Sequence, residues 1–325
     1  KFCGNDIRVS NVVTDSRSIT SSDDALFAAI NGKNHDGHDY VERMLKRGVK
    51  AYIVEREVAI NEVCGMVIVN ATLDALQLLA AHHRKEFRGT VVGITGSNGK
   101  TIVKEWAARS LPSSVRSFAS PKSYNSQLGV ALSLLMLNGN EQVALIEAGI
   151  SQVGEMERLE RMIMPDIVVF TSIGDAHSAN FESIDQKIEE KLKLATYAHT
   201  IIYNNREYRA LADKIGKLYS DRELIDSSSE RIEDSLELNA ALEVDAAHVA
   251  ALMHKLGYSV DGAVFSAKVA MRLELKEGID NSMIIDDTYN SDINSVIVAL
   301  DALHRQSMGR KKIAVISDIL QSGMP

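Results

Sequence analysis

The middle of the chain alternates short apolar runs with longer segments whose apolar residues recur at helical spacing. The short runs, rich in Val and Ile, predict buried strands, and the longer segments predict covering helices. This alternation favours a parallel sheet wrapped by helices, with ligands at the carboxyl ends of the strands. Strands are predicted at "TVVGIT" (90–95), "QVALIEAG" (142–149), "DIVVFTSIG" (166–174) and "TIIYNN" (200–205), and helices at "VGEMERLERMIM" (153–164), "SIDQKIEEKLKLATYA" (183–198), "REYRALADKIG" (206–216) and "AALEVDAAHVAALMHKLG" (240–257).

Two further units flank this central sheet. The predicted N-terminal elements are short strands near Val12 and Tyr52, a helix from Tyr40 to Arg47 and a closing helix from about Thr72 to Phe87. The predicted C-terminal elements are strands joined by a turn within 269–290, a helix to Gln306 and a strand at "KKIAVIS" (311–317). We therefore expect three α/β domains, at 1–87, 88–262 and 263–325. We expect the last to be incomplete, because the chain stops just after a strand-like run.

The first strand of the sheet leads into "GSNGKT", from Gly96 to Thr101, which is similar to a phosphate-binding loop. The usual pattern G-x-x-x-x-G-K-[ST] is not met, because Ile94 stands where its first glycine belongs. The shorter G-x-x-G-K-T still supplies glycines that turn N–H groups inward, a lysine for phosphate charge and a hydroxyl for magnesium at a helix N-terminus. The alternative is a glycine-rich turn in which Lys100 is an ordinary surface lysine.

Polar side chains follow two other strands of the predicted sheet. Glu147 follows "VALI" and His177 follows "DIVVFTSIGDA", so we expect both on the phosphate side of the sheet. Beside Thr101 they could hold magnesium against phosphate oxygens. A helix-capping or salt-bridged Glu147 and an ordinary loop histidine are the alternatives.

One lysine of the helix at 183–198 is predicted to point inward. At about 100° per residue, Lys191 falls at the edge of an apolar stripe and Lys193 points nearly opposite. A buried lysine is costly as a cation, and its neutral amine can react with carbon dioxide to give a carbamate, whose oxygens suit magnesium beside His177. The alternative is a lysine that extends its ammonium to water or pairs with Asp185 or a neighbouring glutamate.

Composition narrows the class of protein. The chain has 325 residues, and its 45% hydrophobic content is enough for real cores. A net charge of -8 without a run of lysine or arginine argues against nucleic acid as the main partner. Cys3 and Cys64 are isolated, which favours a reducing cytosol, and no apolar run is long enough to span a bilayer. Lys1 is not an initiator, so we expect a longer parent chain.

Together these motifs resemble the Mur ligases, three-domain ATP-dependent ligases of peptidoglycan synthesis. "TGSNGKT" looks like the family's shortened phosphate loop, "IEAG" like its magnesium-binding glutamate segment, and "GDAHSANFESIDQKIEEKLKLA" like its stretch from a metal-binding histidine to a modified lysine. "TDSRSI" and "LFAAINGKNHDGHDYV" are similar to its UDP-sugar-binding domain. Within the family, "DDTYNSDINS" most resembles the members that join D-alanyl-D-alanine to UDP-N-acetylmuramoyl-tripeptide.

The resemblance implies a two-step cytoplasmic reaction without nucleic acid, membrane insertion or a tightly bound organic cofactor. The substrate carboxylate attacks the γ-phosphate of ATP, and the dipeptide amine then displaces phosphate from the acyl phosphate. The implied catalytic residues are Lys100, Lys191 and His177. The implied ATP-binding residues are Gly96, Ser97, Asn98, Gly99, Lys100, Thr101, Asp245, Asp287 and Asn290. The implied ligands of two Mg²⁺ ions are Thr101, Glu147, His177 and Lys191, and the implied substrate contacts are Ser16, Arg17 and Asn125.

Two residues depart from the family pattern. Asp245 stands where the family usually offers asparagine to the adenine, and an ionised carboxylate cannot donate a hydrogen bond to the ring nitrogens. Ile293 stands where proline is more frequent, which changes the turn before a helix. We expect the ligase part of this protein to be monomeric. Some members of the family are fused to a C-terminal alanine racemase, and such a fusion would suit a chain that ends early.

Two other functions fit part of the sequence. A folylpolyglutamate-synthetase-like ligase shares the phosphate loop and the acyl-phosphate chemistry, but it lacks a separate N-terminal UDP-binding unit. The alternative from a different class is a nucleotide-binding regulatory or scaffolding module that has lost turnover. Asp245, at the position of the usual asparagine, would be the sign of this loss.

Overall fold

The computed structural model divides into two compact units, Lys1–Phe87 with Ala131–Leu137 and Arg88–Val130 with Asn138–Pro325. The structure describes residues 1–19, 21–32, 35–59, 63–174, 180–230, 240–266, 274–280, 282–288, 293–306 and 309–317. His177 and Asn290, both predicted site residues, lie outside the described residues. Over the described ranges, no helix is both long enough and apolar enough to cross a membrane.

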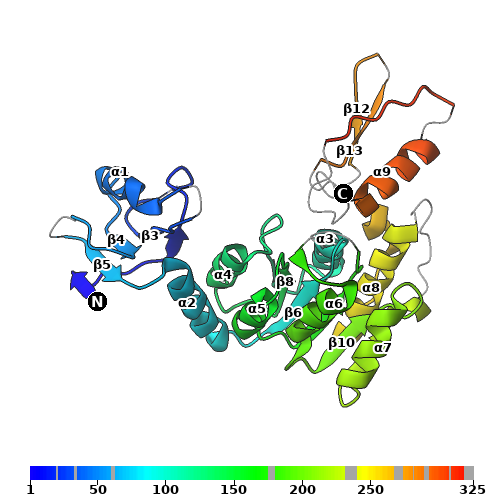
Figure 1. Cartoon of the computed structure of the whole chain (residues 1–325), viewed down its shortest axis with the longest axis horizontal. Coiled ribbons are helices and arrows are strands. Elements are labelled where there is room, and N and C mark those ends of the chain that lie inside the picture. The colour runs from blue at the N-terminus through cyan, green and yellow to red at the C-terminus, as the bar shows by residue number, and fades with distance from the viewer. Residues whose placement is uncertain are drawn as a thin grey trace. The chain divides into compact units, whose positions relative to one another are not determined.

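The first unit is built on a five-stranded sheet in the order β1-β5-β4-β3-β2, in which β1 is antiparallel to β5 and the other pairs are parallel. Its elements are β1 (Phe2–Gly4), β2 (Asn11–Val13), β3 (Ala25–Ala28), η1 (Gly37–Tyr40), α1 (Val41–Lys46), β4 (Ala51–Val54), β5 (Gly65–Ile68) and α2 (Thr72–Glu86) (Figure 1). Phe27, Met44 and Tyr52 are buried in its core. The strands predicted near Val12 and Tyr52 and both predicted helices are confirmed.

The second unit contains a six-stranded, wholly parallel sheet in the order β11-β10-β9-β6-β8-β7. Its strands are β6 (Thr90–Thr95), β7 (Ser117–Ala119), β8 (Val143–Ala148), β9 (Ile167–Phe170), β10 (Thr200–Tyr203) and β11 (Glu223–Asp226). The segments between them form α3 (Lys100–Ser110), α4 (Gln127–Leu135), α5 (Glu155–Ile163), α6 (Ile184–Leu192), η3 (Lys193–Ala195), α7 (Arg209–Leu218), η4 (Ser227–Ser229) and α8 (Ala240–Leu256), with η5 (Gly262–Ser266) after them. From Ala131 on, α4 belongs to the first unit. The predicted parallel sheet wrapped by helices is confirmed.

Helices cover both faces of this sheet. Since successive side chains of a strand point to opposite faces, Val92, Leu145 and Val169 belong to one face, where they form a buried core with residues of α3 and α8. On the other face, α5 contacts β8 and η3 contacts β9. The strands β8 and β9 are buried along their whole length, which explains their continuous apolar runs.

The C-terminal part contains an antiparallel pair of strands, β12 (Glu274–Glu277) and β13 (Met283–Asp286), and the helix α9 (Ile293–Gln306). Ile293, at the position where proline is more frequent, begins α9. The strand predicted at 311–317 is wrong, because these residues have no regular secondary structure and are exposed. Among the described residues no strand pairs with this segment, so its backbone gains no ladder hydrogen bonds and Val315 stays 97% exposed.

A buried histidine on α8 makes the stability of the second unit depend on pH. His248 is fully buried, its Nδ1 lies 3.2 Å from Ser227 Oγ, and burial lowers its pKa from 6.5 to about 4, although Asp226 acts in the opposite direction. Below pH 6.5 the unfolded chain therefore takes up a proton that the folded chain resists. We expect His248 to remove up to about 3 kcal/mol of the free energy of unfolding as the pH falls from 6.5 to 4.

Urea unfolding between pH 7 and pH 5 tests this expectation. Fluorescence of Trp106, the single tryptophan, reports on this unit because its side chain is buried in the core. His248→Gln should flatten the pH dependence, whereas His254→Gln, at a largely exposed position of the same helix, should leave it unchanged. Equal pH dependence in wild type and His248→Gln would contradict the assignment.

Candidate active site

The phosphate loop lies at the point where the chain changes its direction of winding across the sheet. β6 has β8 on one side and β9 on the other, so the residues after β6 face the crevice where doubly wound sheets bind ligands. In the register of the strands, Thr95 is level with both Ala148 and Phe170. Glu147, one residue before the end of β8, and Thr171, directly after β9, therefore lie beside the loop.

Gly99, the last loop residue before α3, requires glycine for two reasons. Its φ of 84° lies in the left-handed region, and a Cβ built on it would lie 2.2 Å from Asp245 Oδ1. The carboxylate of Asp245, on α8, therefore lies directly against the phosphate loop. This position places a negative charge at the predicted phosphate site, and the predicted adenine contact of Asp245 stays a prediction.

The other predicted loop residues are fastened to the segment that follows β9. Ser97 N donates to Ser172 O at 2.6 Å, and Asn98 N donates to Ser172 Oγ at 2.8 Å. Lys100 bends back over the loop, where its Nζ donates to Gly96 O at 2.9 Å and to Ser97 O at 2.8 Å. The lysine thus lies at the N-terminus of α3, where a bound phosphate would meet both its charge and the helix dipole.

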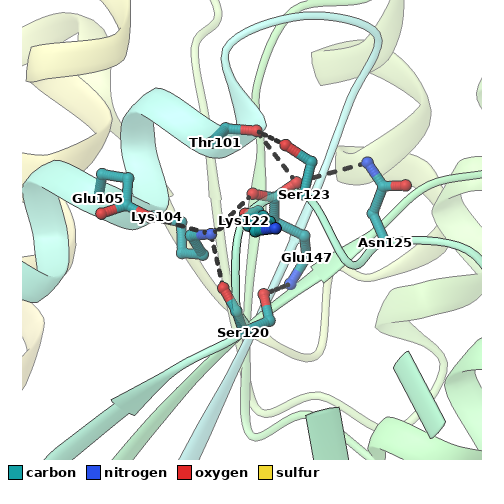
Figure 2. Close-up of polar contacts among 8 residues, drawn as sticks. All are labelled: Thr101, Lys104, Glu105, Ser120, Lys122, Ser123, Asn125 and Glu147. Atoms are coloured by element: carbon teal, nitrogen blue, oxygen red, sulfur yellow. Dashed lines mark hydrogen bonds and ion pairs between the residues drawn. The ribbon is translucent and has the colours of Figure 1, made fainter. Parts of the chain in front are cut away.

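Thr101, Glu147 and Asn125 converge beside this loop (Figure 2). Thr101 Oγ1 lies 3.2 Å from Glu147 Oε2, and Asn125 Nδ2 donates to the same oxygen at 3.4 Å. A hydroxyl and a carboxylate fit Mg²⁺ that keeps waters and phosphate oxygens as its remaining ligands. Within the described residues, no group of three or more His, Cys, Asp or Glu could hold a metal ion. Thr101 and Glu147 therefore fit such an ion as two protein ligands.

Lys191 points inward, as predicted. Its side chain is 2% exposed, and Nζ donates to Gly96 O in the phosphate loop at 3.0 Å. Burial, followed by the charges of Lys100 and Lys187, lowers the pKa of Lys191 well below its usual value. Lys193 instead forms an ion pair with Glu190 at 2.5 Å. The alternative of an ammonium extended to water is therefore wrong for Lys191, whereas its modification stays a prediction.

Comparisons with known proteins decide the family. Residues 94–257 match the Mur ligase middle domain, and residues 8–85 match the catalytic domain of the Mur ligase family. The chain belongs to the Mur ligase family. UDP-N-acetylmuramoyl-tripeptide--D-alanyl-D-alanine ligase of Bacillus subtilis is 29% identical over 97% of this chain and 74% of the relative.

Solved structures agree with the fold of this Mur ligase. MurF from Acinetobacter baumannii matches with a TM-score of 0.84 at 24% identity, over 97% of this chain and 75% of the other. MurF ligase from Thermotoga maritima in complex with ADP matches with a TM-score of 0.76 at 25% identity, over 91% and 75% of the two chains. A bifunctional folylpolyglutamate synthase/dihydrofolate synthase from Yersinia pestis is more distant, with a TM-score of 0.53 at 14% identity over 72% and 71%.

Three further predicted site residues of this Mur ligase belong to other segments of the chain. In the first unit Ser16 is buried, and Arg17 is exposed and paired with Asp15 at 2.8 Å, which lowers the pKa of that carboxyl to about 2. Asp287 directly follows β13. The structure thus groups Lys100, Thr101, Glu147, Asn125, Asp245 and Lys191 in one unit.

Three polar residues around the loop were not predicted from the sequence. Thr171 Oγ1 donates to Asn98 O at 2.5 Å, and Ser172 binds the loop as described above. Lys104, on α3, is completely buried beside Glu147. The sequence pattern could have identified Lys104, because this lysine interrupts the apolar side of α3 that contains Val103 and Ala107.

Proposed function

We propose that this Mur ligase joins D-alanyl-D-alanine to UDP-N-acetylmuramoyl-tripeptide at the expense of ATP. The observation that carries the proposal is the grouping of Lys100, Thr101 and Glu147 at the carboxyl ends of β6 and β8. The relatives named for this reaction match the chain over both units, which supports the choice of substrate. We further propose that the reaction occurs in the cytoplasm.

The residues of the loop can perform the first step through positioning and charge. A carboxylate oxygen of the peptide attacks the γ-phosphorus, the bond to the β-phosphate oxygen breaks, and ADP leaves. Negative charge builds up on the transferring phosphoryl group, where Lys100 and the N–H groups at the start of α3 can stabilise it. Bound Mg²⁺ would supply further neutralisation of the phosphate oxygens. Thr101 and Glu147 would hold this ion.

In the second step the dipeptide amine attacks the acyl carbon and phosphate leaves with the oxygen that came from the peptide carboxylate. The proton that the amine loses can pass to the departing phosphate, and the acyl phosphate must be kept from bulk water, which would hydrolyse it. For this step we propose that Lys191, as a carbamate, and His177 provide the second magnesium site. Asn125 would lie against the peptide substrate, since it shares Glu147 Oε2 with Thr101.

The proposed roles of the domains follow the predicted boundaries. We assign the UDP-sugar part of the substrate to residues 1–87, through Ser16 and Arg17, and the nucleotide to residues 88–262. Asp287 and Asn290 of residues 263–325 would reach the nucleotide when the third domain closes. A C-terminal alanine racemase fusion stays a proposal, supported only by the family resemblance.

Phosphate release with different acceptors tests the proposed function. The enzyme is supplied with ATP, Mg²⁺ and D-alanyl-D-alanine, together with UDP-N-acetylmuramoyl-tripeptide, or it receives a pteroyl glutamate with L-glutamate. We expect rapid release only with the UDP-linked tripeptide. Release only with the pteroyl substrate would establish the folylpolyglutamate alternative, and binding of ATP without release in either case would indicate a module without turnover.

Asp245 offers a prediction about nucleotide affinity. Because its carboxylate lies against Gly99, it repels the phosphates and cannot donate a hydrogen bond to adenine. We expect Asp245→Asn to tighten ATP binding by about tenfold, or to sharpen the preference for ATP over GTP by a similar factor. Calorimetric titration with each nucleotide measures both quantities. Glu243→Gln, at an exposed position of the same helix, should change neither, and unchanged affinities in Asp245→Asn would show that the carboxylate does not act on the nucleotide.

A further inference from the structure

Lys104 brings a buried positive charge to the meeting point of three elements. It lies on α3, one turn after Lys100, and its side chain is completely buried. Nζ lies 2.7 Å from Ser120 O, 3.1 Å from Glu105 Oε1 and 3.2 Å from Glu147 Oε1, and it also donates to Lys122 O (Figure 2). No step of the proposed reaction uses this ammonium group.

We infer that Lys104 is a positioning residue that sets both the orientation of the Glu147 carboxylate and the conformation of the substrate segment, defined as Ser120–Asn125. The effect on catalysis rests on the proposed function, because it acts through Glu147 and Asn125. The effect on the segment itself can be measured without any reaction.

The first part of the inference concerns the two oxygens of Glu147. Its side chain is completely buried, so its charge needs a compensating cation. Among the described residues no hydrogen bond reaches Oε1, and the ammonium of Lys104 faces this oxygen at ion-pair distance. Oε2 is left to Thr101 and Asn125. Lys104 therefore turns the second oxygen toward the proposed magnesium site.

The second part concerns the backbone of the substrate segment. Lys122 has a φ of 51°, a left-handed backbone conformation that residues other than glycine rarely adopt. Its carbonyl accepts from Lys104 Nζ, as does the carbonyl of Ser120 two residues earlier. Because one ammonium holds two carbonyls on either side of Pro121, it favours the bend that this conformation produces.

The bend determines where two polar side chains of the substrate segment lie. Ser123 Oγ is 3.1 Å from Thr101 Oγ1, and Asn125 lies so close to Gly149 that a Cβ there would come within 2.9 Å of Asn125 Cγ. Asn125 is therefore confined between Gly149 and Glu147. Loss of the bend would therefore move Asn125, the proposed substrate contact, and would also remove the contact between Ser123 and Thr101.

Lys104→Met tests the inference because it keeps an unbranched apolar side chain and removes the ammonium. The matched control is Lys214→Met, which removes a lysine on α7 that is paired with Glu189 on α6, far along the chain from the segment. Four quantities are measured: amide hydrogen exchange over 120–126, the affinity for ADP without metal by calorimetry, Mn²⁺ affinity in the presence of ADP by electron paramagnetic resonance, and the KM for the UDP-linked tripeptide.

For Lys104→Met we expect amide exchange over 120–126 to be at least about tenfold faster. The affinity for Mn²⁺ should fall, and the KM for the UDP-linked tripeptide should rise, by a similar factor. The affinity for ADP in the absence of metal should change less than about threefold, because Lys100 and the phosphate loop are untouched. A residue with only a packing role would lower thermal stability without this division between metal affinity and nucleotide affinity. Unchanged exchange and Mn²⁺ affinity in a folded Lys104→Met protein would overturn the inference.

A second pair of variants covers the case in which Lys104→Met does not fold because Glu147 is left as an uncompensated buried charge. Glu147→Gln alone should keep the slow exchange of the substrate segment, since Lys104 still holds the carbonyls of Ser120 and Lys122. The double variant Lys104→Met/Glu147→Gln should exchange at least about tenfold faster there. Equal exchange in the two proteins would overturn the inference. Amide exchange and Mn²⁺ binding do not depend on the identity of the acceptor substrate. These two measurements therefore test the inference even if the proposed function fails.

Discussion

Lys100→Ala is expected to lower ATP turnover by about a thousandfold or more, which corresponds to about 4 kcal/mol of activation free energy. The ammonium lies at the N-terminus of α3, within hydrogen-bond distance of Gly96 O and Ser97 O, where the transferring phosphoryl group would gain negative charge. Alanine removes this charge but leaves the loop attached to Ser172 through the amides of Ser97 and Asn98. Steady-state phosphate release with all substrates present gives the comparison.

The control for this prediction is Lys217→Ala, an exposed lysine near the end of α7, which should keep the wild-type rate. Thermal unfolding of Lys100→Ala should stay close to that of the wild type, because no core contact is removed. Wild-type turnover by Lys100→Ala would mean that "GSNGKT" is only a turn between a strand and a helix.

Lys191→Ala is expected to reduce ligation to a level near the background while the protein stays folded. The ammonium of Lys191 is buried and close to Lys100 and Lys187, an arrangement that favours its neutral amine and therefore its reaction with carbon dioxide. Alanine removes the proposed carbamate oxygens, so short-chain carboxylates such as acetate should restore part of the activity by occupying the vacated space. Ligation rates with and without acetate measure the effect.

The control is Lys193→Ala, on the residue directly after α6, whose ammonium pairs with Glu190 and not with the phosphate loop. It should keep most of the activity and show no response to acetate. Isotopically labelled bicarbonate should give a carbamate signal in the magnetic resonance spectrum of the wild type that Lys191→Ala lacks. Full activity of Lys191→Ala, or no carbamate signal in an active wild type, would contradict the proposed modification.

The central sheet could be predicted because its strands are buried on both faces. The apolar runs that become β6, β8, β9 and β10 are interrupted by polar residues mainly at their ends, so both the strands and the functional positions could be identified. The inward direction of Lys191 followed from helical periodicity for the same reason. Local pattern was informative for these elements because burial is nearly uniform along each of them.

Two of the missed elements lie where this regularity fails. β7 and β11 are the two edge strands, they are short, and several of their residues are exposed or half-buried, so no apolar run marks them. In contrast, "KKIAVIS" has the apolar run of a strand, yet among the described residues no strand lies beside it. A strand is fixed by its neighbours as well as by its own sequence.

The contacts that shape the candidate site depend on residues distant in sequence. Asp245 meets Gly99 only because α8 returns to the same face of the sheet as α3. Lys104, on α3, contacts Ser120 after β7 and Glu147 on β8, which follow it by 16 and 43 positions in the sequence. Periodicity can show that such residues point inward, but the partner that receives them is set by the packing of the whole unit.

Transfer of a heavy oxygen isotope from substrate to phosphate tests the central claim most directly. The terminal carboxylate of UDP-N-acetylmuramoyl-tripeptide is labelled with the heavy isotope, and the reaction is run with unlabelled ATP, D-alanyl-D-alanine and Mg²⁺. If the carboxylate attacks the γ-phosphate and the amine then expels phosphate, each released phosphate carries one labelled oxygen. Released phosphate without the label, formed together with the ligated product, would contradict the acyl-phosphate reaction proposed for this Mur ligase.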